Sequence, residues 1–165
     1  MLISAKVQNL IRRVLRYLLT DIINEIRLSS HLVFGPSERL RIHCSAEVQN
    51  ALFNVRSGEI TVEECAFFGH NVTLLTGRHD FTKFNEARQQ GIPNSGNNII
   101  VRRGAWIASN VVVIGPCEIG QHSVVAAGSI VTRDVPPYCI VAGNPAKVIR
   151  QIPESGSQVT GSLVD

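Results

Sequence analysis

The sequence contains little of what many small-domain classes depend on. Phe (6), Tyr (2) and Trp (1) together make only 9 of 165 residues, and the net charge is only +3. Such a charge excludes nucleic-acid binding through a strongly basic surface, and any anionic ligand must be met by locally placed cations. The four cysteines form no CxxC pair. This excludes a zinc-finger spacing and a dense disulfide framework, and it predicts a reducing, cytoplasmic location.

No apolar run reaches the ~20 residues that a membrane-spanning helix requires. The apolar N-terminus is interrupted by Lys6, Arg12, Arg13, Arg16 and Asp21. We therefore predict neither a signal peptide nor a transmembrane anchor.

Residues 3–27 instead show the period of an amphipathic helix, within an N-terminal segment 1–30. The apolar positions recur every three or four residues: Ile3, Val7, Leu10, Ile11, Val14, Leu18, Ile22 and Ile26. One interpretation is that this helix packs on the rest of the chain or on a neighbouring subunit. The other is peripheral contact with an anionic membrane surface, which the three arginines at 12, 13 and 16 support.

Branched aliphatic residues make up most of the apolar content, with 19 Val, 17 Ile and 12 Leu. This composition favours strands over a helical bundle. One set of aliphatic residues stands six apart without exception: Val101, Ile107, Val113, Ile119, Val125 and Val131. The fourth residue after each is small or modest in volume: Ala105, Val111, Cys117, Ser123, Ser129 and Val135. A period of six is an internal repeat that neither a helix nor an alternating strand produces.

The same period occurs earlier, at Val62, Phe68 and Leu74 and more weakly at Ile42 and Val48. It is lost over residues 78–98, a long polar segment, and long loops inside compact repeats are usually functional or disordered. Pro136 and Pro137 are expected to stop the repeat. Residues 151–165 have too little apolar surface to offset their ordering entropy, so they are predicted to be a mobile tail.

A six-residue repeat predicts an all-β fold over residues 37–150. Each hexapeptide forms one short strand and a turn, and three hexapeptides close one triangular coil of a parallel β-helix. The coils stack at the inter-strand distance of about 4.8 Å, so the sixth-residue aliphatics form continuous ladders inside.

Two stretches carry a resemblance to a known family. WIASNVVVIGPCEIGQHSVVAAGSIVTRDVPPYCIVAGNPAKVIR, together with FFGHNVTLLTGRHDF, resembles hexapeptide-repeat acetyltransferases of the galactoside and maltose O-acetyltransferase type. It is most similar to those that O-acetylate sugars of bacterial surface polysaccharides. The resemblance covers about two thirds of the chain. It implies a left-handed β-helix, a homotrimer, acetyl-CoA as donor, a saccharide acceptor and a site between subunits.

Transfer of an acetyl group to a hydroxyl requires a base, because a neutral hydroxyl is a poor nucleophile. Histidine is suited to this role, and general-base catalysis typically contributes ~10²–10⁴ in rate. His79 stands where the repeat gives way to the loop, and the resemblance assigns the catalytic histidine to this place. The neighbouring Asp80 is expected to shape the loop, because adjacent residues in an extended segment point to opposite sides.

The resemblance also assigns the donor site. Trp106 corresponds to an aromatic residue that flanks the donor, Ser109 to a residue whose backbone faces the acetyl group, and Ala127 to one whose amide bonds the pantetheine. The phosphate-contacting end corresponds to Thr132, Arg133, Lys147 and Arg150. The ordinary interpretations are a packing tryptophan and solvated cations.

Some positions depart from the family pattern. Ala108 and Ala126 stand where relatives often have glycine, and they add methyl groups near the donor track. The acceptor-binding residues of the galactoside enzymes have no secure equivalents, and Asn54, in the LFN segment, is the candidate. Acceptor identity therefore stays open.

Three alternatives remain. The acceptor is an amino sugar and the enzyme an N-acyltransferase, or the chain is a γ-type carbonic anhydrase, or the coil is a non-catalytic trimeric scaffold. The second requires three histidines at one zinc ion, and no third histidine follows His70 and His79 at the spacing of those enzymes. We expect no metal.

Overall fold

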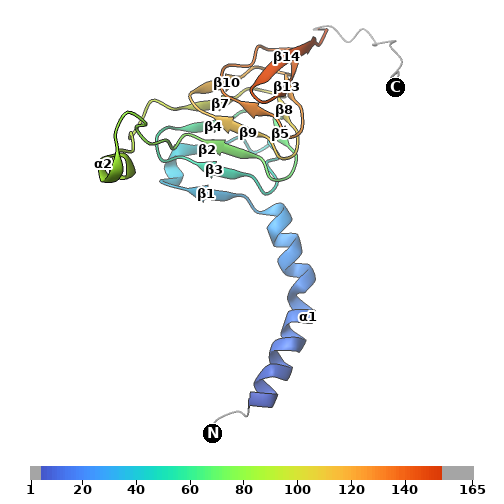
Figure 1. Ribbon diagram of the computed structural model, residues 1–165. Helices are drawn as coiled ribbons and strands as arrows, with labels where there is room; N and C mark the ends of the chain where they lie inside the picture. The colour runs from blue at the N-terminus through green and yellow to red at the C-terminus, as the bar shows by residue number, and fades with distance from the viewer. Residues whose placement is uncertain (1–4, 154–165) are drawn as a thin grey trace. The chain divides into compact units, whose positions relative to one another are not determined.

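The computed structural model describes residues 5–153 (Figure 1). The chain divides into two compact units, Met1–Ser30 and His31–Asp165. The first contains a single helix and the second contains all the strands.

Helix α1 spans Ala5–Ser29, close to the predicted residues 3–27. It has Arg27 in its last turn, where a cation interacts favourably with the helix dipole. Its described side chains, from Val7 to Ser29, are exposed. Within residues 5–153, no helix combines the length and apolarity needed to cross a membrane.

The second unit is a coil with three sheets, which the chain visits in turn. The first sheet holds β1 (Leu32–Phe34), β3 (Leu52–Asn54), β6 (Thr73–Leu75), β9 (Val112–Ile114) and β12 (Ile130–Val131). The second holds β2 (Leu40–Ile42), β4 (Ile60–Val62), β7 (Ile99–Val101) and β10 (Cys117–Ile119). The third holds β5 (Phe67–Phe68), β8 (Trp106–Ile107), β11 (Val124–Val125), β13 (Cys139–Gly143) and β14 (Ala146–Gln151).

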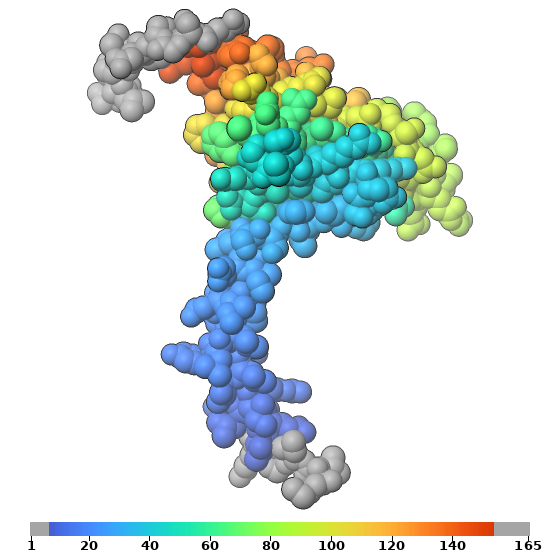
Figure 2. All heavy atoms as spheres, turned by 180° about the vertical axis from the view of Figure 1, so that it is seen from behind, coloured from blue at the N-terminus to red at the C-terminus, as the bar shows by residue number. Residues whose placement is uncertain are grey.

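Strand pairing is parallel except between β13 and β14. In the space-filling view, the colour of this unit changes in successive bands from cyan to orange, as consecutive coils stack on one another (Figure 2). This arrangement is a parallel β-helix with three strands in each full coil.

The hexapeptide period forms the core, as predicted. The six aliphatic residues from Val101 to Val131 are at most 1% exposed, and they lie in turn on the second, third and first sheets. The small residues that follow them, from Ala105 to Val135, are buried too. A register shift of 18 residues, as between Val112 and Ile130, therefore places every aliphatic residue on the equivalent residue of the next coil.

The predicted loop accounts for the one long interruption. Thr73 pairs with Val112, which is 39 residues away rather than 18, so one coil carries about 21 additional residues. Part of this insertion is a short helix, α2 (Asn85–Gln90), which projects from the edge of the coil (Figure 1). At its end the insertion is fixed to the coil, because the Asn97 N–H donates to the Ser57 carbonyl (3.1 Å).

Two expectations about the limits of the coil are corrected. The coil begins at β1, before residue 37, and a 3₁₀ turn (Ser37–Arg39) links β1 to β2. The exposed, three-residue β1 joins β3 by backbone pairing alone and leaves no apolar pattern in the sequence. Nor do Pro136 and Pro137 end the coil, because β13 continues the third sheet and buries Cys139 and Val141. Prolines are tolerated there because they occupy a corner, outside the strand ladders.

The antiparallel strand β14 then covers the edge of the third sheet. Gln151 still belongs to it, and the Ile152 N–H donates to the Tyr138 carbonyl. The remainder of the predicted mobile tail, from 154 onward, lies outside the described residues.

Candidate functional site

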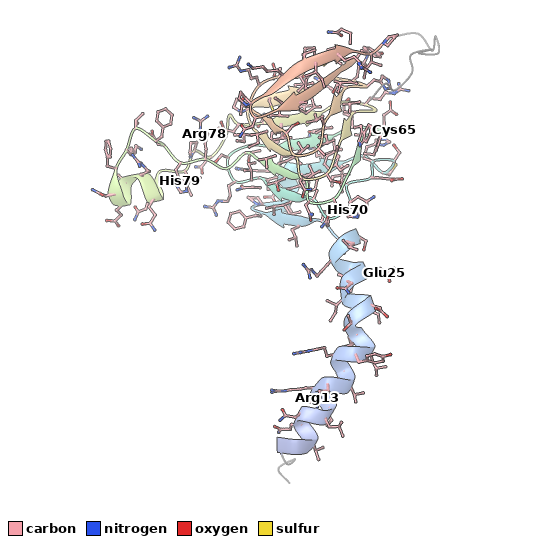
Figure 3. The ribbon with its side chains drawn as sticks, turned by 45° about the vertical axis from the view of Figure 1, so that its right-hand side comes forward. Arg13, Glu25, Cys65, His70, Arg78 and His79 are labelled. Carbon is pink, nitrogen blue, oxygen red and sulfur yellow. The ribbon has the colours of Figure 1, made fainter. Side chains whose placement is uncertain are left out.

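His79 lies just after β6, at the corner between the first and second sheets, where the insertion leaves the coil (Figure 3). Its side chain is exposed. The imidazole Nδ1 lies 2.9 Å from the carbonyl oxygen of Arg88. Because a carbonyl only accepts hydrogen bonds, Nδ1 must carry the proton in this contact. In a neutral imidazole the lone pair then lies on Nε2, so Nε2 is the atom that accepts a proton.

The Arg88 side chain holds the loop that supplies this carbonyl. Its guanidinium donates to the carbonyls of Phe81 and Lys83 and lies 5.0 Å from the centre of the Phe84 ring. The sequence analysis did not identify Arg88. No motif contains it, and its contact with His79 depends on how the insertion folds back.

Asp80 shapes the loop, as the sequence predicts. Its Oδ1 accepts hydrogen bonds from the backbone N–H (3.0 Å) and hydroxyl (2.6 Å) of Thr82, and Lys83 lies 3.6 Å from Oδ2. The Thr82 hydroxyl contributes most to lowering the pKa of this carboxyl. Asp80 therefore stays ionised within the loop and makes no hydrogen bond with His79.

A cavity of about 240 Å³ brings Asn54 and His79 together. It is lined by Phe34, Asn54, Arg56, Gly77, Arg78, His79 and Ile92. These residues come from successive coils, because β3 pairs with both β1 and β6. The Asn54 side-chain oxygen accepts the Arg56 N–H (3.1 Å), which leaves the Asn54 amide nitrogen as the group with donors to offer.

Gly77 is what allows Asn54 to lie here. A Cβ on Gly77 would stand 2.6 Å from Oδ1 and 2.7 Å from Nδ2 of Asn54. Any larger residue must therefore displace the Asn54 side chain.

A second cavity, of about 320 Å³, adjoins His79. Its lining includes Arg78, His79, Phe81, Pro93 and Asn97. Since both cavities are lined by His79 and Arg78, the imidazole stands where two ligands can approach each other. That arrangement suits transfer of a group between two bound molecules.

The predicted donor residues lie partly at another corner. Trp106, on β8, is 44% exposed and stacks on Phe67 with ring centres 5.7 Å apart and planes 15° apart. Ser109 and Ala127 follow β8 and β11, at the corner between the third and first sheets. The Ser109 carbonyl accepts the Gly128 N–H (3.0 Å), whereas the Ala127 N–H makes no backbone hydrogen bond within residues 5–153.

The residues predicted at the phosphate end are exposed. Thr132 and Arg133 follow β12, at the same corner as His79 but two strands further along the first sheet, about 10 Å away. Lys147 and Arg150 are on β14. None of these three cations forms an ion pair with a carboxylate of the described chain.

Within one chain, the structure therefore does not assemble all the predicted residues. His79 and Asn54 lie at one end of the first-sheet strands, and Ser109 and Ala127 lie at the other. A three-residue strand spans about 10 Å. The base and the donor residues thus form two separate groups on one coil.

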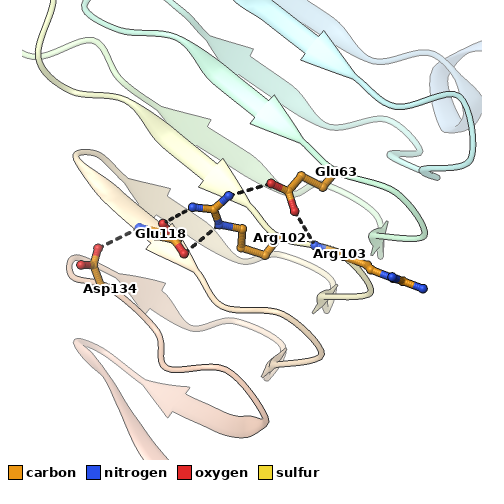
Figure 4. Close-up of polar contacts among 5 residues, drawn as sticks. All are labelled: Glu63, Arg102, Arg103, Glu118 and Asp134. Carbon is orange, nitrogen blue, oxygen red and sulfur yellow. Dashed lines mark hydrogen bonds and ion pairs between the residues drawn. The ribbon is translucent and has the colours of Figure 1, made fainter.

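A larger cavity, of about 420 Å³, lies elsewhere, beside β2 and β4. Two of the residues that line it, Glu63 and Glu64, form ion pairs with Arg102 (2.8 Å) and Arg103 (3.2 Å). Arg102 also binds Glu118, whose N–H donates to Asp134 (Figure 4). These carboxylates tie neighbouring coils together and leave little free chemistry at this cavity.

Comparison with known proteins decides which family the repeat resembles. Residues 98–133 match the family model of the bacterial transferase hexapeptide (six repeats). A galactoside O-acetyltransferase of Escherichia coli K12 is 39% identical over 98 residues, which cover 56% of this chain and 44% of that protein. The chain spans about half the length, or less, of the curated relatives it matches.

Solved structures agree with this similarity. A maltose O-acetyltransferase from Clostridium difficile 630 has a TM-score of 0.58 at 25% identity, covering 76% of this chain and 68% of that one. A galactoside acetyltransferase in complex with coenzyme A has a TM-score of 0.54 at 29% identity, covering 77% and 63%. The resemblance to hexapeptide-repeat acetyltransferases is confirmed.

A zinc site is the main competing interpretation. In residues 5–153, no three His, Cys, Asp or Glu side chains are grouped so that they can hold a metal ion.

Proposed function

We propose that the protein is an acetyl-CoA-dependent O-acetyltransferase that acts on a hydroxyl of a saccharide in surface-polysaccharide biosynthesis. The observation that carries this proposal is the orientation of His79, whose Nδ1 is held by the Arg88 carbonyl while its ring adjoins two cavities. The coenzyme A complex of a similar acetyltransferase supports the choice of donor. Because that donor is a cytoplasmic metabolite, we place the reaction in the cytoplasm.

In the proposed reaction, Nε2 of His79 takes the proton of the acceptor hydroxyl as its oxygen attacks the thioester carbonyl. The imidazolium is stabilised because Nδ1–H remains bonded to the Arg88 carbonyl. The tetrahedral intermediate then breaks its carbon–sulfur bond, and the imidazolium returns the proton to the coenzyme A thiolate. The free Ala127 N–H binds the pantetheine arm, and Trp106 flanks it.

We propose direct transfer in a ternary complex, without an acetyl-cysteine. Burial raises the pKa of the Cys117 thiol to about 12 and also raises that of Cys139. Both therefore stay protonated and poorly nucleophilic at neutral pH. Isolation of an acetylated enzyme would contradict this mechanism.

We also propose that the coil is left-handed and that three copies assemble. The separation of the His79 corner from the corner with Ser109 and Ala127 supports this, because a neighbouring copy can bring its second group to the first. A complementation experiment tests it. His79→Ala chains mixed with Trp106→Ala chains should recover part of the lost activity only if sites are shared between copies. Two inactive homo-oligomers that regain nothing after verified exchange of subunits would contradict the shared site.

Helix α1 is proposed to make peripheral contact with an anionic membrane. Its apolar positions are exposed, and Arg12, Arg13 and Arg16 place three charges within five residues (Figure 3). Full-length protein should sediment with vesicles that contain phosphatidylglycerol, and less with neutral ones. Replacing the three arginines with glutamine should weaken this sedimentation, whereas Arg103→Gln should not. Absence of vesicle binding would assign the helix to packing instead.

A direct test of activity is an acceptor screen with acetyl-CoA and detection of the free thiol. Wild type should acetylate a saccharide hydroxyl, and His79→Ala should not. A product acetylated only on an amino sugar nitrogen would establish the N-acyltransferase alternative. Failure to bind acetyl-CoA in calorimetry would leave the scaffold.

A further inference from the structure

The cavity that brings Asn54 and His79 together also contains two arginines, Arg56 and Arg78, and no acidic residue lines it. Neither arginine forms an ion pair with a carboxylate of the described residues. The nearest carboxylate along the chain, Asp80, lines the neighbouring cavity and is bound to Thr82 and Lys83. Two unpaired cations beside the proposed base are unexpected for a pocket that takes only neutral sugars.

The Arg56 segment is fixed in place. Its N–H donates to Asn54 Oδ1, its carbonyl accepts a hydrogen bond from Arg39 (3.0 Å), and its guanidinium carbon lies 5.8 Å from the Phe34 ring centre. These contacts reduce the conformational freedom that a surface arginine otherwise loses on binding. Arg78 follows Gly77 directly and lies beside His79 (Figure 3).

We infer that the acceptor carries an anionic group, a carboxylate or a phosphate, close to the hydroxyl that is acetylated. This inference rests on the proposed function and names the class of its substrate. Arg56 and Arg78 bind the anion, because guanidinium groups match the two oxygens of a carboxylate or phosphate. Phe34 and Ile92 provide apolar surface for the C–H face of the sugar ring, and the Asn54 amide donates to a hydroxyl.

The chemistry is consistent with the base. An anion that is neutralised by two arginines adds little net charge to the cavity, so the imidazole is not held in its protonated form. The anion also fixes the ring, which keeps one hydroxyl within reach of Nε2. Selection of that hydroxyl follows from positioning.

Matched acceptors test the inference with the full-length protein. Galactose, galacturonic acid and galactose 6-phosphate differ only at carbon 6, so they separate the neutral, carboxylate and phosphate cases. We expect kcat/KM at least tenfold higher for one of the anionic sugars, with a KM that rises with salt. The sugar that shows the advantage identifies the anion.

Three variants separate this effect from general damage. Arg56→Gln and Arg78→Gln should each raise the KM of the anionic acceptor about tenfold while changing that of galactose less than about twofold. Arg41→Gln is the control, because Arg41 is exposed and pairs with Glu59 away from this cavity. The KM of acetyl-CoA should stay unchanged in all three.

Two results would overturn the inference. In the first, neutral and anionic sugars are used equally and both arginine variants affect them alike. In the second, the variants raise the KM of acetyl-CoA instead, which assigns the arginines to the donor phosphates. Calorimetric binding of the three sugars without acetyl-CoA keeps this test independent of turnover. If binding of the anionic sugar depends on Arg56 and Arg78 but no acetyl group is transferred, the proposed function fails and the anion site stands.

Discussion

The Nδ1 atom of His79 lies 2.9 Å from the carbonyl oxygen of Arg88, which is nine residues further along the chain. The insertion that interrupts the coil therefore reaches back and fixes the tautomer of the imidazole. A loop with this role contributes to the chemistry, beyond connecting two strands.

Two substitutions of His79 separate its role as base from its role as an anchor of the loop. His79→Asn keeps an N–H that can bond the Arg88 carbonyl, whereas His79→Ala keeps none. Both remove the proton acceptor, so both should lower turnover by ~10² or more with acetyl-CoA affinity retained. The acceptor KM should rise only for the alanine variant. Near-normal turnover in either correctly assembled variant would remove His79 from the mechanism.

Gly77→Ala should act on the acceptor through Asn54. The new Cβ would stand 2.6 Å from Oδ1 of Asn54, so that side chain must rotate, while the coil is left intact. We expect the acceptor KM to rise severalfold, with little change in the acetyl-CoA KM. The double variant with Asn54→Ala should be no worse than Asn54→Ala alone, because both changes remove one interaction. Additive effects would show that Asn54 and Gly77 act independently.

Arg133, Lys147 and Arg150 should bind the donor phosphates. Each exposed contact is weak and screened by salt, so single neutral substitutions should raise the acetyl-CoA KM modestly and leave saturated turnover near normal. Arg133→Ala with Lys147→Ala should be clearly worse. Fluorescence of Trp106, the chain's single tryptophan, gives a parallel binding measurement.

Acetyl-dephospho-coenzyme A serves as the control for this prediction. Substitution of the residue that meets the 3′-phosphate should matter less for this donor. If all three variants treat both donors as wild type does, the phosphate site lies elsewhere.

The Arg102–Glu118 pair should contribute to stability in a pH-dependent manner. The hydrogen bond from Arg102 lowers the pKa of Glu118. A lowered pKa means that the stabilisation is present above the ordinary glutamate value and is lost as the pH falls through the folded-state value. Glu118→Gln should therefore unfold at a lower temperature than wild type at neutral pH, and this difference should close below about pH 4.

The expected size is at most ~1 kcal/mol, because the two side chains are 39% and 41% exposed and solvent screens them. Thermal unfolding across the pH range measures it. An equal difference between Glu118→Gln and wild type at neutral and acidic pH would show that packing, rather than charge, is responsible.

The repeat could be predicted because its signal is local. An aliphatic residue such as Val113 is buried by its counterparts 18 residues before and after, so the period itself encodes the contacts. The same argument located the insertion, since residues 78–98 match the length of the extra chain in one coil. The limits of the coil were less predictable, because β1 and β14 pair through backbone atoms that carry no sequence pattern.

The sequence by itself determined the hexapeptide coil, the place of the insertion, the helical N-terminus and the candidate base, because each depends on residues that repeat or lie close together in the chain. Only the tertiary structure decided what surrounds that base. The Arg88 carbonyl, the Asn54 amide and the guanidinium groups of Arg56 and Arg78 meet at His79 because three successive coils and a returning loop converge at one corner. Contacts of this kind join residues at irregular separations, and a repeat of six contains no information about them.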